Sequence, residues 1–398
     1  METVPFYPMQ RATECPFDPP PGLREMGPIG RVRIWDGSTP WVVTGYEAHR
    51  FVLSDQRFSA DARRDGYPAE SAAVAERIHD FRSLIMMDEP EHGAQRRMLS
   101  KNFTLKSVEA MRPRVAQIVD GLIDDLLAGP NPVDLVAAFA LPVPSLVICE
   151  LLGVPYDGHD FFQDCSRKLF SQSCTVEETL EAHVALQEYM LKLVDAKDTE
   201  PGDDMISRLV AEQLRPGNLS RAEIAEMALL MLVAGHESTA NMIALGTLAL
   251  LRHPDQLAAL RDADDPKEIA GAVDELLRYL SVVHVGRRRV ATEDVELAGQ
   301  LVKAGEGVIL ADGASNRDES VFPAPDTLDL QRKGRQHVAF GYGSHQCLGQ
   351  LLARMELQVV CGTLYRRIPT LKLAIPFDEV QFKHDMVVYG VRSLPVSW

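Results

Sequence analysis

Apolar residues recur at helical spacing along most of this chain. The spacing of three and four residues is clearest over 108–127, 179–196 and 348–368. Shorter alternating runs, typical of strands, lie on both sides of Asp36-Gly37 in segment 31–45 and return near 285–311 and 371–398. No internal repeat or linker interrupts the pattern. It predicts a mainly α protein with small β-sheets and a single domain over residues 1–398.

The longest apolar run covers residues 228–251 and reaches the length of a membrane span, about 24 residues. Its centre is polar, however, and includes the carboxylate of Glu237, which is costly in the middle of a bilayer. Ser220 followed by Glu223 is a capping box that predicts where a helix begins. We therefore expect a long helix through a protein core and no membrane segment.

Composition narrows the class of protein. Of the 398 residues, 46% are hydrophobic and 25% are charged, as in ordinary globular proteins. A formal charge of −16 argues against nonspecific nucleic-acid binding, which needs a cationic surface. Six cysteines in so long a chain make a disulfide framework improbable. The proline-rich start lacks the order of a signal peptide, so a cytoplasmic location is expected.

One cysteine stands apart from the others. In "HVAFGYGSHQCLGQ", residues 337–350, Cys347 lies among glycines and directly before a helical segment. Gly341, Gly343 and Gly349 carry no side chain and let the backbone approach something flat and bulky. A helix N-terminus stabilises a thiolate, and a single thiolate suits the iron of a haem. The alternative is a buried structural cysteine.

The same stretch resembles the haem-ligand loop of the cytochromes P450. Phe340, Gly343, His345, Cys347 and Gly349 occupy the positions of that motif. The resemblance implies the P450 fold, a helical prism around a buried haem b, with Cys347 as the axial ligand of the iron.

Two further motifs strengthen the resemblance. "ELLR" matches the Glu-x-x-Arg of the family, which implies that Glu275 and Arg278 form a buried structural pair with Arg332 as third member. Thr327 stands where the family often has arginine.

"AGHEST", residues 234–239, resembles the oxygen-activation motif of the family. The resemblance implies that Ala234 and Gly235 make room above the haem and that Glu237 relays protons. Ser238 stands where threonine is usual, and its hydroxyl can bond back to a carbonyl and bend the helix.

The two carboxylates of a haem require cations and hydrogen-bond donors. Here the resemblance implies His92 and Arg96 from "EHGAQRR", Arg289 from "GRRRVATED", and His345.

The resemblance implies a monooxygenase that inserts one atom of dioxygen into a small apolar organic substrate, such as a hydroxylation in secondary metabolism. Electrons would come from NAD(P)H through a ferredoxin reductase and a ferredoxin, and the chain would act as a monomer. The ferredoxin is expected to dock at basic residues near the cysteine loop. These are Arg96, Arg97 and Lys101, with Arg112 and Arg114.

Two alternatives remain open. Segment 139–155 and "NMIALG" also resemble the P450-type nitric oxide reductases, and Arg63 and Arg64 could attract a nicotinamide dinucleotide. The acid Glu237 argues for dioxygen chemistry instead. A haem sensor would not need Glu237 and Ser238 in an apolar helix.

The substrate pocket implied by the family is formed by five segments, with an apolar lining that is expected to include Val282, Val283, Val285, Met86 and Met87. The five segments are 65–87, 165–180, the start of "LLMLVAG", 281–286 and 385–390.

Overall fold

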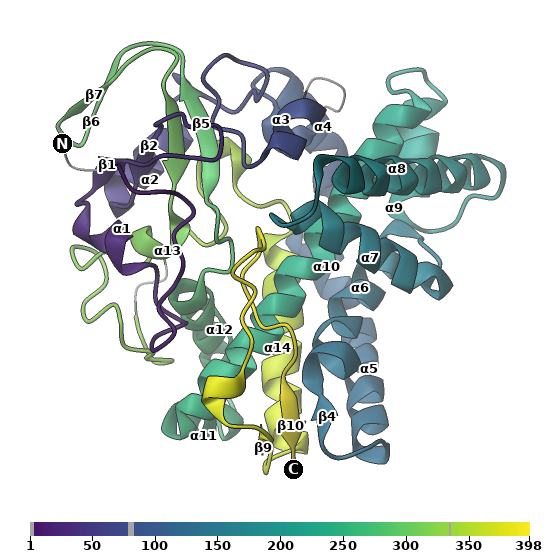
Figure 1. Cartoon of the computed structure of the whole chain (residues 1–398). Coiled ribbons are helices and arrows are strands. Elements are labelled where there is room, and N and C mark those ends of the chain that lie inside the picture. Colours follow the sequence, from purple (N-terminus) through teal and green to yellow (C-terminus); the bar gives the residue numbers. More distant parts are fainter. Residues whose placement is uncertain (1–3, 79–82, 334–335) are drawn as a thin grey trace.

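The computed structural model describes residues 4–78, 83–333 and 336–398. Helices dominate, as the hydrophobic pattern predicts (Figure 1). The α-helices in these residues are α1 (Pro21–Glu25), α2 (Tyr46–Ser54), α3 (Ala72–Arg77), α4 (Glu91–Ser100), α5 (Leu105–Ala128), α6 (Pro142–Leu152), α7 (His159–Phe170), α8 (Val176–Thr199), α9 (Met205–Leu209), α10 (Arg221–Arg252), α11 (Pro254–Arg261), α12 (Pro266–Leu280), α13 (Asp312–Ser315) and α14 (Gln350–Arg367).

The strands are short and form small sheets. They are β1 (Ile29–Arg31), β2 (Trp41–Val43), β3 (Phe58–Ser59), β4 (Val133–Asp134), β5 (Arg287–Ala291), β6 (Val295–Leu297), β7 (Gln300–Val302), β8 (Gly307–Leu310), β9 (Lys372–Leu373) and β10 (Pro395–Ser397). One sheet has the order β1-β2-β8-β5-β3, a second has β4-β10-β9, and β6 pairs with β7.

The predicted hairpin is confirmed. β1 and β2 pair antiparallel with Ile29 opposite Val43 and Arg31 opposite Trp41. Gly37 has a φ of +84°, which suits glycine in the turn, and Asp36 Oδ1 accepts a hydrogen bond from the Ser38 amide.

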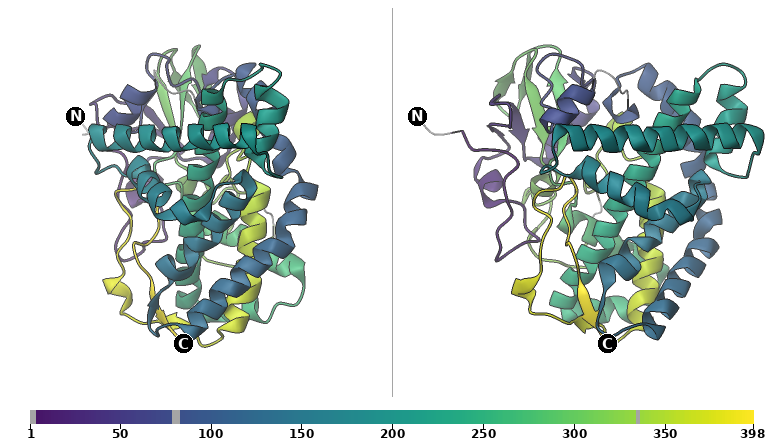
Figure 2. Two further views of the ribbon diagram at one scale, coloured as in Figure 1. Left: turned by 90° about the vertical axis from the view of Figure 1, so that its right-hand side faces the viewer. Right: turned by 45° about the vertical axis from the view of Figure 1, so that its right-hand side comes forward.

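The long apolar run is a core helix. α10 begins at the capping box, where Ser220 and Glu223 each accept the other's backbone N–H. It is long and apolar enough to cross a membrane, but 72% of its most apolar 18-residue window is buried inside the protein. α10 runs through the middle of the molecule, and α8 lies across its first turns (Figures 1 and 2).

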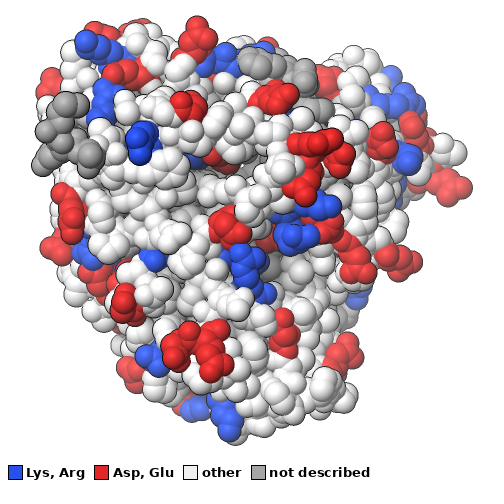
Figure 3. Space-filling model, viewed as in Figure 1, with Lys and Arg blue, Asp and Glu red and all other residues white. Residues whose placement is uncertain are grey.

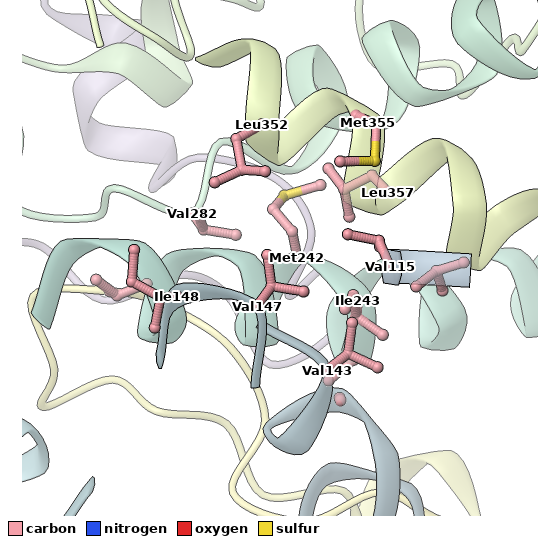
Figure 4. Close-up of a cluster of buried hydrophobic side chains, with 14 of the residues drawn as sticks. Val115, Val143, Val147, Ile148, Met242, Ile243, Val282, Leu352, Met355 and Leu357 are labelled. Atoms are coloured by element: carbon pink, nitrogen blue, oxygen red, sulfur yellow. The ribbon is translucent and has the colours of Figure 1, made fainter. Parts of the chain in front are cut away.

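The main core joins α10 to the helices around it. Figure 4 shows side chains from α5, α6, α10 and α14 meeting in one apolar cluster, with Val115, Val147, Met242 and Met355 among those labelled. This packing fixes α14 beside α10, so the loop before α14 is held close to the polar centre of α10.

Candidate active site

The loop that carries Cys347 is folded by its own backbone. The Gly341 amide donates to Val338 O and the Cys347 amide donates to Phe340 O, both at 2.8 Å. α14 begins at Gln350, three residues after the cysteine. The Cys347 thiol is half-buried, and all six cysteines are free.

Two glycines of this loop lie close to neighbouring protein segments. Gly343 has a φ of +71°, and a Cβ there would lie 2.4 Å from Leu53 O at the end of α2. A Cβ on Gly341 would lie 3.0 Å from Arg287 Nε, whereas one on Gly349 would meet nothing closer than Phe103, at 3.9 Å. Gly341 and Gly343 therefore also make room for neighbouring protein, and their approach to a flat group stays a prediction.

Three guanidinium groups surround the Cys347 thiol. Burial raises the pKa of this thiol, while the Gly349 amide and the charges of Arg287, Arg96 and Arg354 oppose the rise. Helix capping alone therefore does not produce the expected thiolate. A bound metal cation would, because it removes the proton from a coordinating thiol.

Two histidines and Arg96 lie together beside the loop. The imidazoles of His92 and His345 stack with ring centroids 3.8 Å apart, and His92 Nδ1 lies 3.1 Å from Glu89 Oε1. Arg96 Nη2 donates to Gln346 O at 2.6 Å, which ties α4 to the cysteine loop. Burial and the charge of Arg289 lower the pKa of His345 to about 3, so His345 is a neutral hydrogen-bonding group here.

Arg289 on β5 completes this group. Its side chain is buried, it lines the same cavity as His345, and its Nη1 donates to the Arg288 carbonyl at 2.7 Å. No carboxylate pairs with Arg289 within the described ranges. A buried guanidinium without a protein counter-charge fits an anionic group of a ligand. Together with Cys347, these residues fit a haem and its two carboxylates.

A cavity of about 310 Å³ lies beside α10 and is also lined by residues of α3, α8 and β5. It is bordered by residues of all five segments expected to form a substrate pocket, although residues 79–82 lie outside the described residues. Met86 and Val283 line it as expected. Val282, Val285 and Met87 are instead buried elsewhere in the packing and do not line this cavity.

The centre of α10 faces the cavity through Ala234. Ser238 Oγ donates to Ala234 O at 2.9 Å, the back-bond expected from the sequence. α10 nevertheless remains a continuous helix from Arg221 to Arg252. Gly235 does not border the cavity, since a Cβ there would lie 2.9 Å from Ile148 of α6. Its expected place above the haem stays a prediction.

Glu237 does not border this cavity and is held by other groups. Asn241 Nδ2 donates to Glu237 Oε2 at 3.1 Å, and Lys383 Nζ lies 3.8 Å from the same oxygen. Glu237 is buried, whereas 17% of the Lys383 side chain is exposed. The pair therefore connects the protein interior to the surface.

The Glu-x-x-Arg pair is fully buried. Arg278 Nε and Nη2 lie 2.7 and 2.8 Å from the oxygens of Glu275, and Arg332 Nε lies 3.1 Å from both. Arg278 Nη1 also donates to the carbonyls of Asn316 and Pro325 at 2.9 Å. Because Asn316 Oδ1 accepts the Val338 amide, this network reaches the start of the cysteine loop.

The expected basic surface is partly neutralised. Lys101 pairs with Glu212 at 2.8 Å, and Arg112 and Arg114 pair with Glu109 and Glu150 at 2.7 Å. Arg97 is exposed and has no ion pair within the described part of the chain. On the face seen in Figure 3, acidic and basic side chains are interspersed.

Sequence reasoning missed several residues of the site. Arg287 pairs with Asp312 and donates to Ala339 O at 3.1 Å, yet only Arg289 of "GRRRV" was singled out. The run of three arginines was a usable signal. The polar residues Arg77, His183 and Glu226 also line the cavity, and no sequence pattern indicates them.

Comparison with known proteins places the chain in a family. Residues 269–370 match the family model described as cytochrome P450. The chain is 51% identical to cytochrome P450 GfsF of Streptomyces halstedii, over 100% of this chain and 97% of that protein. It is 49% identical to the pentalenic acid synthase of Streptomyces avermitilis, over 98% and 97%.

Solved structures agree with this match. The crystal structure of GfsF superposes with a TM-score of 0.92, covering 99% of this chain and 100% of that chain. The mycinamicin VIII C21 methyl hydroxylase MycCI of Micromonospora griseorubida, bound to mycinamicin VIII, is 40% identical with a TM-score of 0.93, over 99% and 100%. The expected fold class is therefore confirmed, and the chain belongs to the cytochrome P450 family.

Proposed function

We propose that this haem monooxygenase hydroxylates a small organic molecule of secondary metabolism with electrons from a ferredoxin. The observation that carries the proposal is the cavity bordered by Ala234 of α10 and His345 of the cysteine loop. It brings the cysteine loop and the oxygen-activation motif to one space. Relatives named for pentalenic acid and mycinamicin VIII support a substrate of that class.

Haem binding falls to residues of three segments. Cys347 would ligate the iron, and His92, Arg96, Arg289 and His345 would hold the two carboxylates. A thiolate-ligated haem supplies the reductive activation of dioxygen. The protein binds and orients the substrate and supplies protons. Phe340, which packs under the Arg354 guanidinium at 4.5 Å, shapes the loop.

Proton delivery uses Ser238 and Glu237 of α10. Ser238 Oγ donates to Ala234 O and keeps its lone pairs for a water on the cavity side. Glu237 Oε2 accepts a proton that arrives past Lys383 and passes it on toward the cavity. Asn241 holds the carboxylate between these two positions.

The redox partner is an acidic ferredoxin that docks near Arg97, beside the cysteine loop. Its electrons come from NAD(P)H through a ferredoxin reductase. We propose a cytoplasmic monomer in which residues 1–398 form one catalytic domain. A nitric oxide reductase and a haem sensor find no support among the relatives.

A labelling experiment tests this function. Purified holoenzyme is titrated with macrolide lactones and terpenoid acids, beginning with mycinamicin VIII, and binding is followed by the haem spectrum. The compound that binds is then turned over with NADPH, ferredoxin reductase, ferredoxin and oxygen-18 dioxygen. One labelled oxygen atom in each product molecule is expected. Rapid haem oxidation by NADH and nitric oxide without ferredoxin would instead establish the reductase.

A further inference from the structure

One end of the active-site cavity is charged, against the expectation of an apolar lining. Arg77 at the end of α3, His183 on α8 and Glu226 on α10 border it together. Arg77 Nη1 lies 3.4 Å from His183 Nδ1, and His183 Nε2 lies 3.6 Å from Glu226 Oε2. Three helices that are distant in sequence thus meet in one polar chain.

Two buried polar atoms at this end retain hydrogen-bonding capacity. Neither Ser83 Oγ nor Glu226 Oε2 has a hydrogen-bond partner among the described residues. Both side chains also border a second cavity of about 260 Å³. Buried polar atoms are nearly always paired, so a ligand group that fills this end would satisfy them.

The charges at this end compensate one another. The charges of Glu226 and Glu70 act on the half-buried Arg77, and Arg288 Nη1 lies 3.0 Å from Glu70 Oε1. An ionic ligand group would therefore find no unopposed counter-charge. A hydroxyl group can donate to the carboxylate and accept from the guanidinium without upsetting this balance.

We propose that this part of the cavity binds the neutral, polyhydroxylated end of an amphipathic substrate. Its polar side chains are Arg77, Ser83, His183 and Glu226. Leu229, Leu230 and Val233 border the cavity between Glu226 and Ala234 and take the substrate's apolar body. Glu226 and Ala234 are eight residues apart, about 12 Å along α10. The oxidised carbon lies at about that distance from the hydroxyls, a point that rests on the proposed function.

The test compares two ligands of which only one can donate hydrogen bonds. Isothermal titration calorimetry measures decane-1,2-diol and 1,2-dimethoxydecane binding to holoenzyme of the wild type, Glu226→Leu and Glu188→Leu. Glu188 is an exposed residue of α8 and serves as the matched control. The diol is expected to bind about tenfold tighter than the ether to wild type and to Glu188→Leu, a preference that Glu226→Leu abolishes. Equal affinities in wild type, or a preference that survives Glu226→Leu, overturn the proposal.

A second variant tests the charge balance. Arg77→Met leaves Glu226 without the neighbouring guanidinium charge, so decyltrimethylammonium is expected to bind at least fivefold tighter than to wild type. An unchanged affinity of Arg77→Met for decyltrimethylammonium would contradict the proposed charge balance. The reduced carbon-monoxide spectrum and turnover of the same holoenzyme report on the proposed function separately. Normal turnover without diol preference defeats only this inference, and diol preference without oxygen insertion defeats only the function.

Discussion

Glu237 is positioned by Asn241 and Lys383, and its replacement by glutamine tests its role. Glu237→Gln can keep a hydrogen bond to Asn241 but cannot carry a proton. Product formation is expected to fall about 100-fold, and a larger share of the electrons from NAD(P)H is expected to appear as hydrogen peroxide.

Product, cofactor and peroxide are measured together, so the yield per electron is known. Glu188→Gln, an exposed change, is the control. Because Lys383 is the group nearest the surface, Lys383→Met should give a smaller loss of the same kind. Full coupling in Glu237→Gln would remove Glu237 from the proton path.

Glu356 on α14 gives a prediction about pH. Its carboxyl is buried, and burial raises its pKa to about 8. Between roughly pH 5 and 8 the folded protein holds this proton while the unfolded chain has lost it, so the group's contribution to stability falls as pH rises. Relative to wild type, Glu356→Gln should gain roughly 1.4 kcal/mol in unfolding free energy per pH unit over that range.

Denaturant unfolding of both proteins at intervals from pH 5 to 9 measures this difference. Glu188→Gln should show no such slope, since Glu188 is exposed. A flat difference between wild type and Glu356→Gln would mean that Glu356 is ionised in the folded protein.

Motif residues were identified from sequence, but their contacts were not. Gly343 belongs to the cysteine motif, yet the atom that excludes a side chain there is Leu53 O, in a helix about 290 residues earlier. Gly235 likewise contacts Ile148 of α6. A motif fixes residue types along the chain, whereas such contacts depend on how distant helices pack.

α12 depends on its buried network. In Glu275→Gln, Arg278 and Arg332 lose the carboxylate that both contact. A buried ion left without its partner costs about 3–5 kcal/mol. The free energy of unfolding should fall by about that amount, and haem should be lost on mild heating because the network reaches the cysteine loop through Asn316.

The exposed pair of Glu109 and Arg112 on α5 has the same three-residue spacing and is the matched control. Glu109→Gln should cost less than about 1 kcal/mol. Denaturant unfolding and haem absorbance measure both variants. Equal small losses would show that the α12 pair contributes no more than a surface pair.

The elements themselves were largely predictable. The three-and-four spacing identified α5, α8 and α14, the capping box placed the start of α10, and Asp36-Gly37 marked the hairpin of β1 and β2. The charged end of the cavity was not predictable. Arg77, His183 and Glu226 come from three helices and resemble surface residues in each one. Only tertiary packing brings them together.

The molecule carries a formal net charge of −16, and most of the expected basic residues near the cysteine loop are paired with acidic side chains. Lys101, Arg112 and Arg114 are each paired with a glutamate, which leaves Arg97 as an exposed cation beside the cysteine loop. Arg96, the preceding residue, contacts that loop through Gln346 O. An acidic electron donor would therefore depend on Arg97 more than on its paired neighbours.

Replacing Arg97 by glutamine should raise the KM for ferredoxin about three- to tenfold at low ionic strength, and added salt should shrink the difference because it screens exposed charges. Turnover driven by hydrogen peroxide needs no electron donor and should be unchanged. Arg392→Gln is the control, since Arg392 is an exposed arginine of the C-terminal segment that also carries Lys383. An unchanged KM in Arg97→Gln, or an equal rise in Arg392→Gln, would place the docking site elsewhere.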